Sequence, residues 1–315
     1  MSKKLNSNLN IAKVKKDDEF YTFLSDIENE LKFYKDQFLN KVILMPCDDP
    51  ELISNLPIGN YPEDRASKFW VYFHKNFKHL GIKKIIATHY NENSTSYAIE
   101  YNGKGNDNDI LEFKKIDLTD DGDFRSKEVQ KIYKQADIII TNPPFSLFIP
   151  FLKNLIELNK KFLIIASETK STSKNVFKYF KENKVWFGYT SVKQFIYCDK
   201  ERKTTEVKKF GNIAWMTNMN VTKRNEEIIL LKKYSKEEYP KFENIDAISV
   251  DKINLIPNDY WELMGVPSSF LKKYNPNQFE ILDIDENFKE NLYPGKRAYL
   301  FGKKKYARII IRRIK

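Results

Sequence analysis

The chain has 315 residues, of which 41% are hydrophobic and 31% are charged, proportions typical of a globular protein. No apolar run approaches the ~20 residues of a membrane span, and the polar N-terminus carries no secretory signal, so we expect a cytoplasmic protein with no membrane partner. The two cysteines and three histidines lack metal-ligand spacing, which predicts that the protein uses no metal. The net charge of +11 favours a polyanionic partner such as nucleic acid.

Elements predicted from the apolar pattern alternate between helices and strands up to residue 182. Apolar residues at three- and four-residue steps predict helices, and short continuous apolar runs predict buried strands. The predicted helices span 18–40, 66–80, 126–135, 147–159 and 174–182. The predicted strands span 41–45, 83–88, 96–101, 136–141 and 162–166. This alternation indicates parallel βαβ units, so we expect an α/β domain with a largely parallel central sheet.

The character of the chain changes after about residue 185. Short aromatic strands are predicted at 186–189, 194–198 and 211–217. A lysine-rich hairpin loop is predicted at 200–209, and the irregular remainder ends in a basic tail. We therefore divide the chain into an α/β domain at 1–219, whose residues 1–16 form a flexible basic arm, and a second region at 220–315.

The sharpest motif is Asn-Pro-Pro-Phe at 142–145, directly after a predicted buried strand. Open α/β sheets bind ligands at the carboxyl ends of their strands, where this motif lies. The side-chain oxygen of Asn142 and the carbonyl of Pro143 can accept both hydrogens of a planar amino group and draw its nitrogen toward tetrahedral geometry. Pro143 and Pro144 stiffen this loop, and Phe145 offers a ring on which a base can stack. An ordinary Pro-Pro turn is the alternative.

Several segments stand in a fixed order along the chain. They are DEFYT (18–22), CDDP (47–50), ATHY (87–90), GDFRS (122–126), TNPPF (141–145), FGNIAWMTN (210–218), MGVP (264–267) and KYNP (273–276). With these segments the chain resembles the EcoRI-type adenine-specific DNA methyltransferase family over roughly residues 17–312. The resemblance implies a Rossmann-like methyltransferase fold and transfer of a methyl group from S-adenosylmethionine to N6 of an adenine flipped out of double-stranded DNA.

The resemblance also implies a cofactor site. The segment at 20–22 would contact the methionine part, and Asp123 and Phe124 the adenine ring of the cofactor. At 48–50 this chain has acidic residues where many methyltransferases have glycines, and a carboxylate suits a cationic cofactor. The implied cofactor residues are Phe20, Tyr21, Thr22, Asp48, Asp49, Pro50, His89, Tyr90, Asp123, Phe124 and Asn142.

The partner of the cofactor ribose stays open, because His89, Tyr90, Asn91 and Glu92 all follow the second predicted strand. The resemblance places Trp215, together with Phe145, where the flipped base would stack.

Target recognition is expected in 220–315, which ends in the basic tail. Phosphate contacts with the DNA backbone are predicted for Lys296, Arg297, Lys303, Lys304, Lys305 and Arg308. We expect a monomer that acts in restriction–modification, with a cognate endonuclease as a genetic partner, or a solitary or phage-borne enzyme. The alternatives are a methyltransferase acting on RNA adenine or protein glutamine, and a catalytically silent DNA-binding relative.

Overall fold

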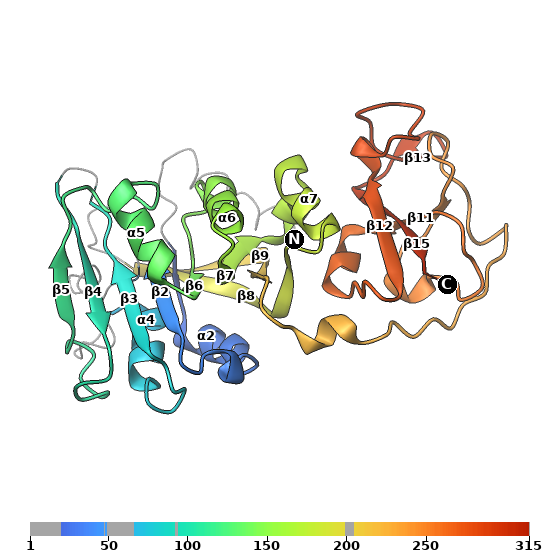
Figure 1. The fold of residues 1–315 in the computed structure, drawn as a ribbon. Coiled ribbons are helices and arrows are strands. Elements are labelled where there is room, and N and C mark those ends of the chain that lie inside the picture. The colour runs from blue at the N-terminus through green and yellow to red at the C-terminus, as the bar shows by residue number, and fades with distance from the viewer. Residues whose placement is uncertain (1–19, 47, 49–65, 92–93, 199–204, 315) are drawn as a thin grey trace. The chain divides into compact units, whose positions relative to one another are not determined.

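The computed structural model describes residues 20–46, 48, 66–91, 94–198 and 205–314. They form two compact units, shown in Figure 1. The first takes in residues up to Glu168 together with Gly188–Met219, and the second takes in Thr169–Phe187 and the residues from Asn220 onward. The segment 169–187 thus groups with the C-terminal residues.

The first unit is built on a nine-stranded sheet with the order β1-β8-β9-β7-β6-β2-β3-β4-β5. Its strands are β1 (Phe20–Thr22), β2 (Val42–Pro46), β3 (Lys84–Thr88), β4 (Tyr97–Tyr101), β5 (Lys114–Asp117), β6 (Ile138–Thr141), β7 (Lys161–Ser167), β8 (Trp186–Cys198) and β9 (Thr205–Thr217). The central strands β3, β2, β6 and β7 are parallel, whereas β4, β5 and β9 pair antiparallel with their neighbours. The α/β fold expected from the sequence is confirmed.

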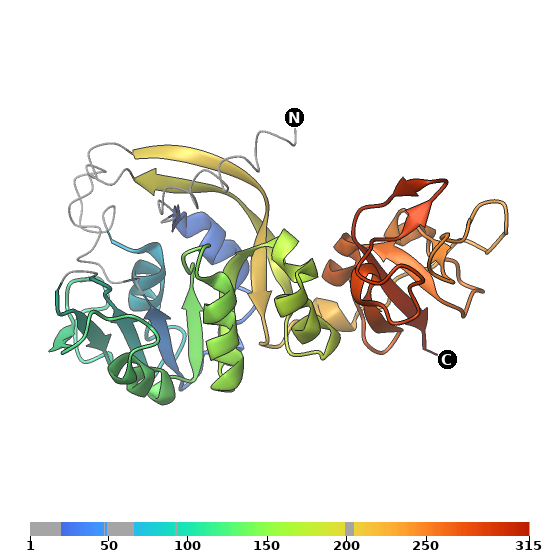
Figure 2. The ribbon, with the colours of Figure 1, turned by 90° about the horizontal axis from the view of Figure 1, so that it is seen from above.

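Burial explains which strands lie at the centre. Every residue of β2 and β6 is buried, as expected for strands covered on both faces. All four residues of β5 are exposed at the sheet edge, where charged side chains discourage further strand pairing. Strand β5 was not predicted, because its Lys-Lys-Ile-Asp sequence has no apolar pattern. Strands β8 and β9 form a long curved ribbon (Figure 2).

Helices cover both faces of the sheet, with α5 and α6 on one face and α2 and α4 on the other (Figure 1). The helices are α2 (Leu24–Leu31), α4 (Lys68–Lys75), α5 (Lys127–Gln135), α6 (Phe148–Glu157) and, in the second unit, α7 (Lys174–Lys181). The helix predicted over 18–40 is wrong at both ends. Phe20–Thr22 pair with β8, and a separate 3-10 turn at Lys35–Gln37 follows α2.

A buried carboxylate joins α2 to β8. Glu30 has no exposed surface and accepts hydrogen bonds from the Tyr34 hydroxyl, the Tyr189 amide and both the amide and hydroxyl of Thr190. A β-carbon at Gly188 would lie 2.1 Å from the Glu30 carboxylate, so only glycine fits there. These contacts fix α2 against the strand that holds β1 in place.

The second unit contains strands that its irregular sequence did not predict. A four-stranded sheet has the order β10-β11-β15-β12, and β13 and β14 form a separate hairpin. These strands are β10 (Ile248–Ser249), β11 (Met264–Pro267), β12 (Phe279–Ile284), β13 (Tyr299–Leu300), β14 (Lys303–Lys304) and β15 (Arg308–Arg313). Phe242, Ile245, Phe288 and Ile310 form part of the core of this unit. Across the described residues of both units, no helix combines the length and apolar character needed to cross a membrane.

Candidate active site

The order of the parallel strands sets the position of the site. Within the sheet, β3 lies next to β2 on one side and β6 lies next to β2 on the other side. The order of the strands along the chain therefore reverses at β2. The carboxyl ends of β2 and β6 therefore form a topological switch point, where α/β sheets bind ligands. Asp48 follows β2, and Asn142 follows β6. The fold thus brings together two segments that are far apart in the sequence.

Hydroxyl groups hold the Asp48 carboxylate at this edge. Ser67 Oγ donates to Asp48 Oδ1 at 2.8 Å. The Thr141 hydroxyl lies 2.6 Å from Asp48 Oδ2 and 2.9 Å from the Pro46 carbonyl oxygen, so its single proton is shared between two acceptors. Neither Ser67 nor Thr141 was singled out as a functional residue from the sequence, because only the register of β2 against β6 reveals their role. The side chain of Asp48 is thus held in a fixed orientation at the switch point.

Asn142 is oriented by the first strand. Its Nδ2 donates to the Phe20 carbonyl oxygen at 2.6 Å, and that oxygen can only accept, so the amide orientation is determined. Its Oδ1 is buried and accepts no hydrogen bond from the residues that the structure describes. A buried acceptor without a donor costs about 1–3 kcal/mol. The site therefore favours a ligand that brings an N–H group to this oxygen.

Aromatic rings pack around the end of the Asn-Pro-Pro-Phe motif. The Phe145 ring stacks on Phe20 with 5.7 Å between ring centres, and it meets Phe195 and Phe210 edge-on. Tyr197 completes the cluster beside Phe20. Because Phe145 is only 4% exposed, its ring anchors the motif in this structure.

A second group of predicted cofactor residues meets at the end of β3. Ser96 Oγ donates to the His89 carbonyl at 2.7 Å, and the Asn91 amide donates to the Asp121 carbonyl at 2.8 Å. Gly122 has a φ of +83°, and a β-carbon there would lie 2.0 Å from the His89 carbonyl oxygen. Glycine at this position therefore lets the loop that carries Asp123 lie against the end of β3.

The side chains of this second group have partners within the chain. His89 stacks on Tyr97 with 4.7 Å between ring centres. Asp123 accepts from Arg125 Nε at 2.8 Å and from Nη2 at 2.5 Å, and these hydrogen bonds lower the pKa of the Asp123 carboxyl below its usual 3.8. The half-buried ring of Phe124 meets Phe151 edge-on at 5.3 Å. Both oxygens of Asp123 accept from Arg125. Asp123 could therefore bind an adenine amino group only if one oxygen accepted from both groups or if Arg125 moved away.

Trp215 lies in the core. It has no exposed surface, sits opposite Ile165 in the β7–β9 pair and contacts Phe69 edge-on at 6.0 Å. Its indole N–H donates to no acceptor within the described part of the chain. The exposed ring face that base stacking requires is therefore missing at Trp215 in this conformation. Of the other predicted cofactor residues, Asp49 and Pro50 lie outside the described residues.

The predicted phosphate-binding residues divide into two groups. Lys296, Lys303 and Lys304 are exposed. The remaining three form ion pairs inside the second unit: Arg297 with Asp285 and Glu286, and both Lys305 and Arg308 with Asp251. Arg308 is only 6% exposed, so the expectation that it contacts DNA phosphates is not supported in this structure. Its hydrogen bond to Asp251, at 2.6 Å, instead stabilises the start of β15.

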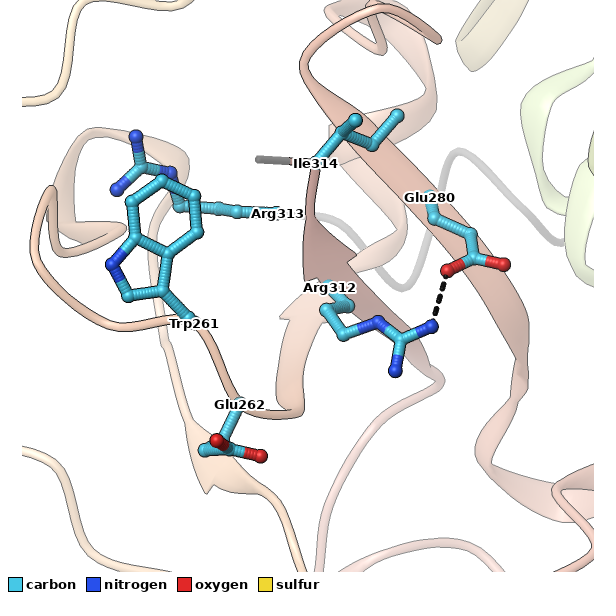
Figure 3. Close-up of a pocket in the computed structure, with 6 residues that line it drawn as sticks. All are labelled: Trp261, Glu262, Glu280, Arg312, Arg313 and Ile314. Carbon is cyan, nitrogen blue, oxygen red and sulfur yellow. Dashed lines mark hydrogen bonds and ion pairs between the residues drawn. The ribbon is translucent and has the colours of Figure 1, made fainter.

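The second unit also holds a surface cavity of about 410 Å³ near the end of β15 (Figure 3). Arg312 contacts Glu280 at 2.8 Å, and the Arg313 guanidinium lies 4.1 Å from the centre of the Trp261 ring. The lining residues are Trp261, Glu262, Glu280, Arg312, Arg313 and Ile314. No sequence signal marks this cavity, because its residues come from three separate segments. It combines donors, acceptors and an aromatic ring.

Among the described residues, no group of three or more His, Cys, Asp or Glu side chains could hold a metal ion.

Comparisons with known proteins find similar sequences over nearly the whole chain. A family model described as the adenine-specific methyltransferase EcoRI matches residues 8–314. The chain is 39% identical to the Type II methyltransferase M.EcoRI of Escherichia coli, over 98% of this chain and 96% of that protein. It is also similar to the Type II methyltransferases M.MgeORF184P of Mycoplasma genitalium (35% identical, covering 97% and 98%) and M.MpnI of Mycoplasma pneumoniae (34%, covering 96% and 97%). No solved structure matches the chain significantly.

Proposed function

Because the chain belongs to the EcoRI-type family of adenine-specific methyltransferases, we propose that it methylates N6 of adenine in double-stranded DNA. The observation that carries this proposal is the buried Oδ1 of Asn142 at the carboxyl end of β6, which has no hydrogen-bond donor among the described residues. The exocyclic amino group of adenine carries two hydrogens and is a complementary ligand for this acceptor.

The chemical role of Asn142 follows from the electronic structure of adenine. The lone pair of N6 is delocalised into the ring, so the amino group is a poor nucleophile. Asn142 Oδ1 and the Pro143 carbonyl would accept the two hydrogens, localise the lone pair and aim it at the methyl group. Because the Phe20 carbonyl fixes the orientation of the amide, the oxygen of Asn142 rather than its nitrogen would meet the amino hydrogens.

The chain's own residues fit a cationic methyl donor. S-adenosylmethionine supplies an electrophilic methyl group on a positively charged sulfonium. Asp48, held by Ser67 and Thr141, places a carboxylate beside Asn142 and would attract this charge. His89, Tyr90, Asp123 and Phe124, gathered at the end of β3, would hold the nucleoside part, and the segment at 20–22 the methionine part.

The target adenine must leave the DNA helix, because N6 cannot reach a methyl donor inside a base stack. Phe145 is the aromatic residue next to Asn142, and we assign base stacking to it first. Its stacked neighbour Phe20 would have to shift to open a face. Stacking on Trp215 would demand a larger rearrangement, since that ring lies in the core. We assign target recognition to the second unit, with phosphate contacts at Lys296, Lys303 and Lys304.

The experiment is transfer of a labelled methyl group from S-adenosylmethionine to unmethylated genomic DNA, followed by nucleoside analysis. Label in N6-methyladenine is expected, and sequencing of the modified sites then gives the recognition sequence. Label appearing only in RNA or in protein glutamine would contradict the proposed substrate. Calorimetry measures the binding of S-adenosylmethionine separately. A protein that binds the cofactor but does not methylate DNA can thus be distinguished from one that does not bind the cofactor.

The names of the relatives point to a role in restriction–modification. We propose that the protein acts as a monomer and protects DNA from a cognate endonuclease. Genomic DNA from cells that express the protein should then resist a nuclease that cuts the methylated sequence. DNA that is cut equally with and without expression would contradict this role.

A further inference from the structure

The hairpin of β13 and β14 has an unusual residue at its tip. Leu300 pairs with Lys303, so Phe301 and Gly302 form a two-residue loop. Their φ angles are +52° and +68°, as in the type I′ turn, which favours Asn-Gly. Of the five non-glycine residues with positive φ in the described ranges, four are asparagine and the fifth is Phe301. A bulky residue is strained in this conformation, which is a mark of functional positions.

The strained phenylalanine is exposed rather than packed. Phe301 is 77% exposed, so burial of its ring does not offset the strain. Three more large apolar side chains in this short stretch are exposed: Leu292 at 72%, Tyr293 at 51% and Tyr306 at 93%. Four exposed large apolar side chains in one short stretch of sequence make this stretch a candidate interaction surface. Lys296, Lys303 and Lys304 are exposed in the same stretch, and they favour a polyanionic partner.

A buried polar network holds the base of the hairpin rigid. Asn244 Oδ1 accepts from the Tyr299 amide, and Asn244 Nδ2 donates to Asn291 Oδ1. Asp285, which has no exposed surface, accepts from the Ala298 amide at 2.9 Å and pairs with Arg297. At the tip, the Gly302 amide donates to Glu243 at 2.6 Å. The exposed ring therefore stands on a fixed support rather than on a loose loop.

We propose that this hairpin, residues 299–304, is a wedge that inserts the Phe301 ring between stacked bases of duplex DNA, while Lys303 and Lys304 contact phosphates. A flat aromatic side chain can replace the stacking partner of a base, and apolar wedges inserted at base steps are a known means of opening the duplex. The inference rests on the proposed DNA substrate. It extends that proposal by naming the surface that would open the helix.

The test compares Phe301→Asn with Leu231→Asn, a substitution of an 82% exposed residue elsewhere in the second unit. Asparagine adopts positive φ readily, so Phe301→Asn should keep or raise the melting temperature. Binding to a labelled DNA duplex, measured by fluorescence anisotropy, should weaken at least tenfold for Phe301→Asn and stay unchanged for Leu231→Asn. In duplexes carrying 2-aminopurine at successive positions, wild-type protein should unstack one position besides the methylated adenine, and Phe301→Asn should not.

Three outcomes would overturn the wedge. If Phe301→Asn binds DNA as tightly as the wild type and gives the same 2-aminopurine profile, the ring does not insert; retained methylation by the wild type would leave the proposed function intact. If the wild type binds no duplex DNA at all, both proposals fall. A lowered melting temperature of Phe301→Asn, with equal loss of all activities, would indicate a structural role instead.

Discussion

The two units hold their candidate functional residues in different ways. In the first, Asp48, Asn142 and His89 follow parallel strands, and hydrogen bonds from neighbouring segments fix them at one edge of the sheet. In the second, the basic residues come from one stretch of sequence, and the fold separates them into paired and exposed groups. Position at a strand end therefore predicts the geometry of a site, whereas a run of charge does not predict which charges a ligand can reach.

The largest expected effect comes from Asn142→Ala. It removes the buried acceptor and should lower kcat for methyl transfer about 10²–10³-fold, the usual cost of deleting one preorganised hydrogen-bonding group. Binding of S-adenosylmethionine should change little, because the role of Asn142 is toward the target amino group. Single-turnover methylation and calorimetry check the two parts. Asn108→Ala, at an exposed loop position, is the control. Near-normal turnover of Asn142→Ala would remove Asn142 from the mechanism.

The contrast within the basic tail gives the next prediction. Arg308→Ala removes a buried side chain and its hydrogen bond to a carboxylate, so the free energy of unfolding should fall by about 1–3 kcal/mol. Lys303→Ala should leave stability unchanged. It should instead reduce the slope of log affinity for DNA against log salt concentration by about one. Thermal unfolding and salt titrations measure both. The reverse pattern would show that the distinction between paired and exposed cations is wrong.

Thr141→Val tests the support of Asp48. The change keeps the shape but deletes the hydroxyl that lies 2.6 Å from the carboxylate, so the KM for S-adenosylmethionine should rise roughly fivefold to tenfold, about 1 kcal/mol. Thr217→Val is a matched control, since its hydroxyl is equally buried but bonds to the Phe162 carbonyl on β7. Both variants should lose similar stability. An equal rise in KM for both would mean that Thr141 acts only through folding.

The sequence predicted most of the first unit because local patterns decide it. Strands β2, β3, β6 and β7 are continuous apolar runs, and they lie within a residue or two of their predicted bounds. The site was predictable wherever one motif at a strand end carries the chemistry, as with Asn142. The hydroxyls of Ser67 and Thr141 were not, since their partners are set by strand register. The burial of Trp215 and the ion pair of Arg308 depend on tertiary packing, which the composition of the chain does not predict.

The smallest effect concerns the Asp123–Arg125 pair. Because the pKa of Asp123 in the folded protein lies below its usual 3.8, the pair contributes stability above that pH, and this contribution is lost as pH falls through the lowered pKa. Arg125 is largely exposed, so the gain should stay under about 1 kcal/mol. Urea unfolding of wild type and Asp123→Asn should differ slightly at pH 7 and converge in acid. A difference that grows in acid would contradict the assigned sign.

The same pair distinguishes a structural from a cofactor-binding role. If Asp123 accepts from the adenine of the cofactor, Asp123→Asn should raise the KM for S-adenosylmethionine well beyond the effect of Arg125→Met. Both variants break the ion pair, but only the first alters the acceptor itself. Equal effects of the two substitutions would show that Asp123 supports the loop that carries it and does not bind the cofactor. Its role would then be structural, like that of the ion-paired Arg297 and Arg308.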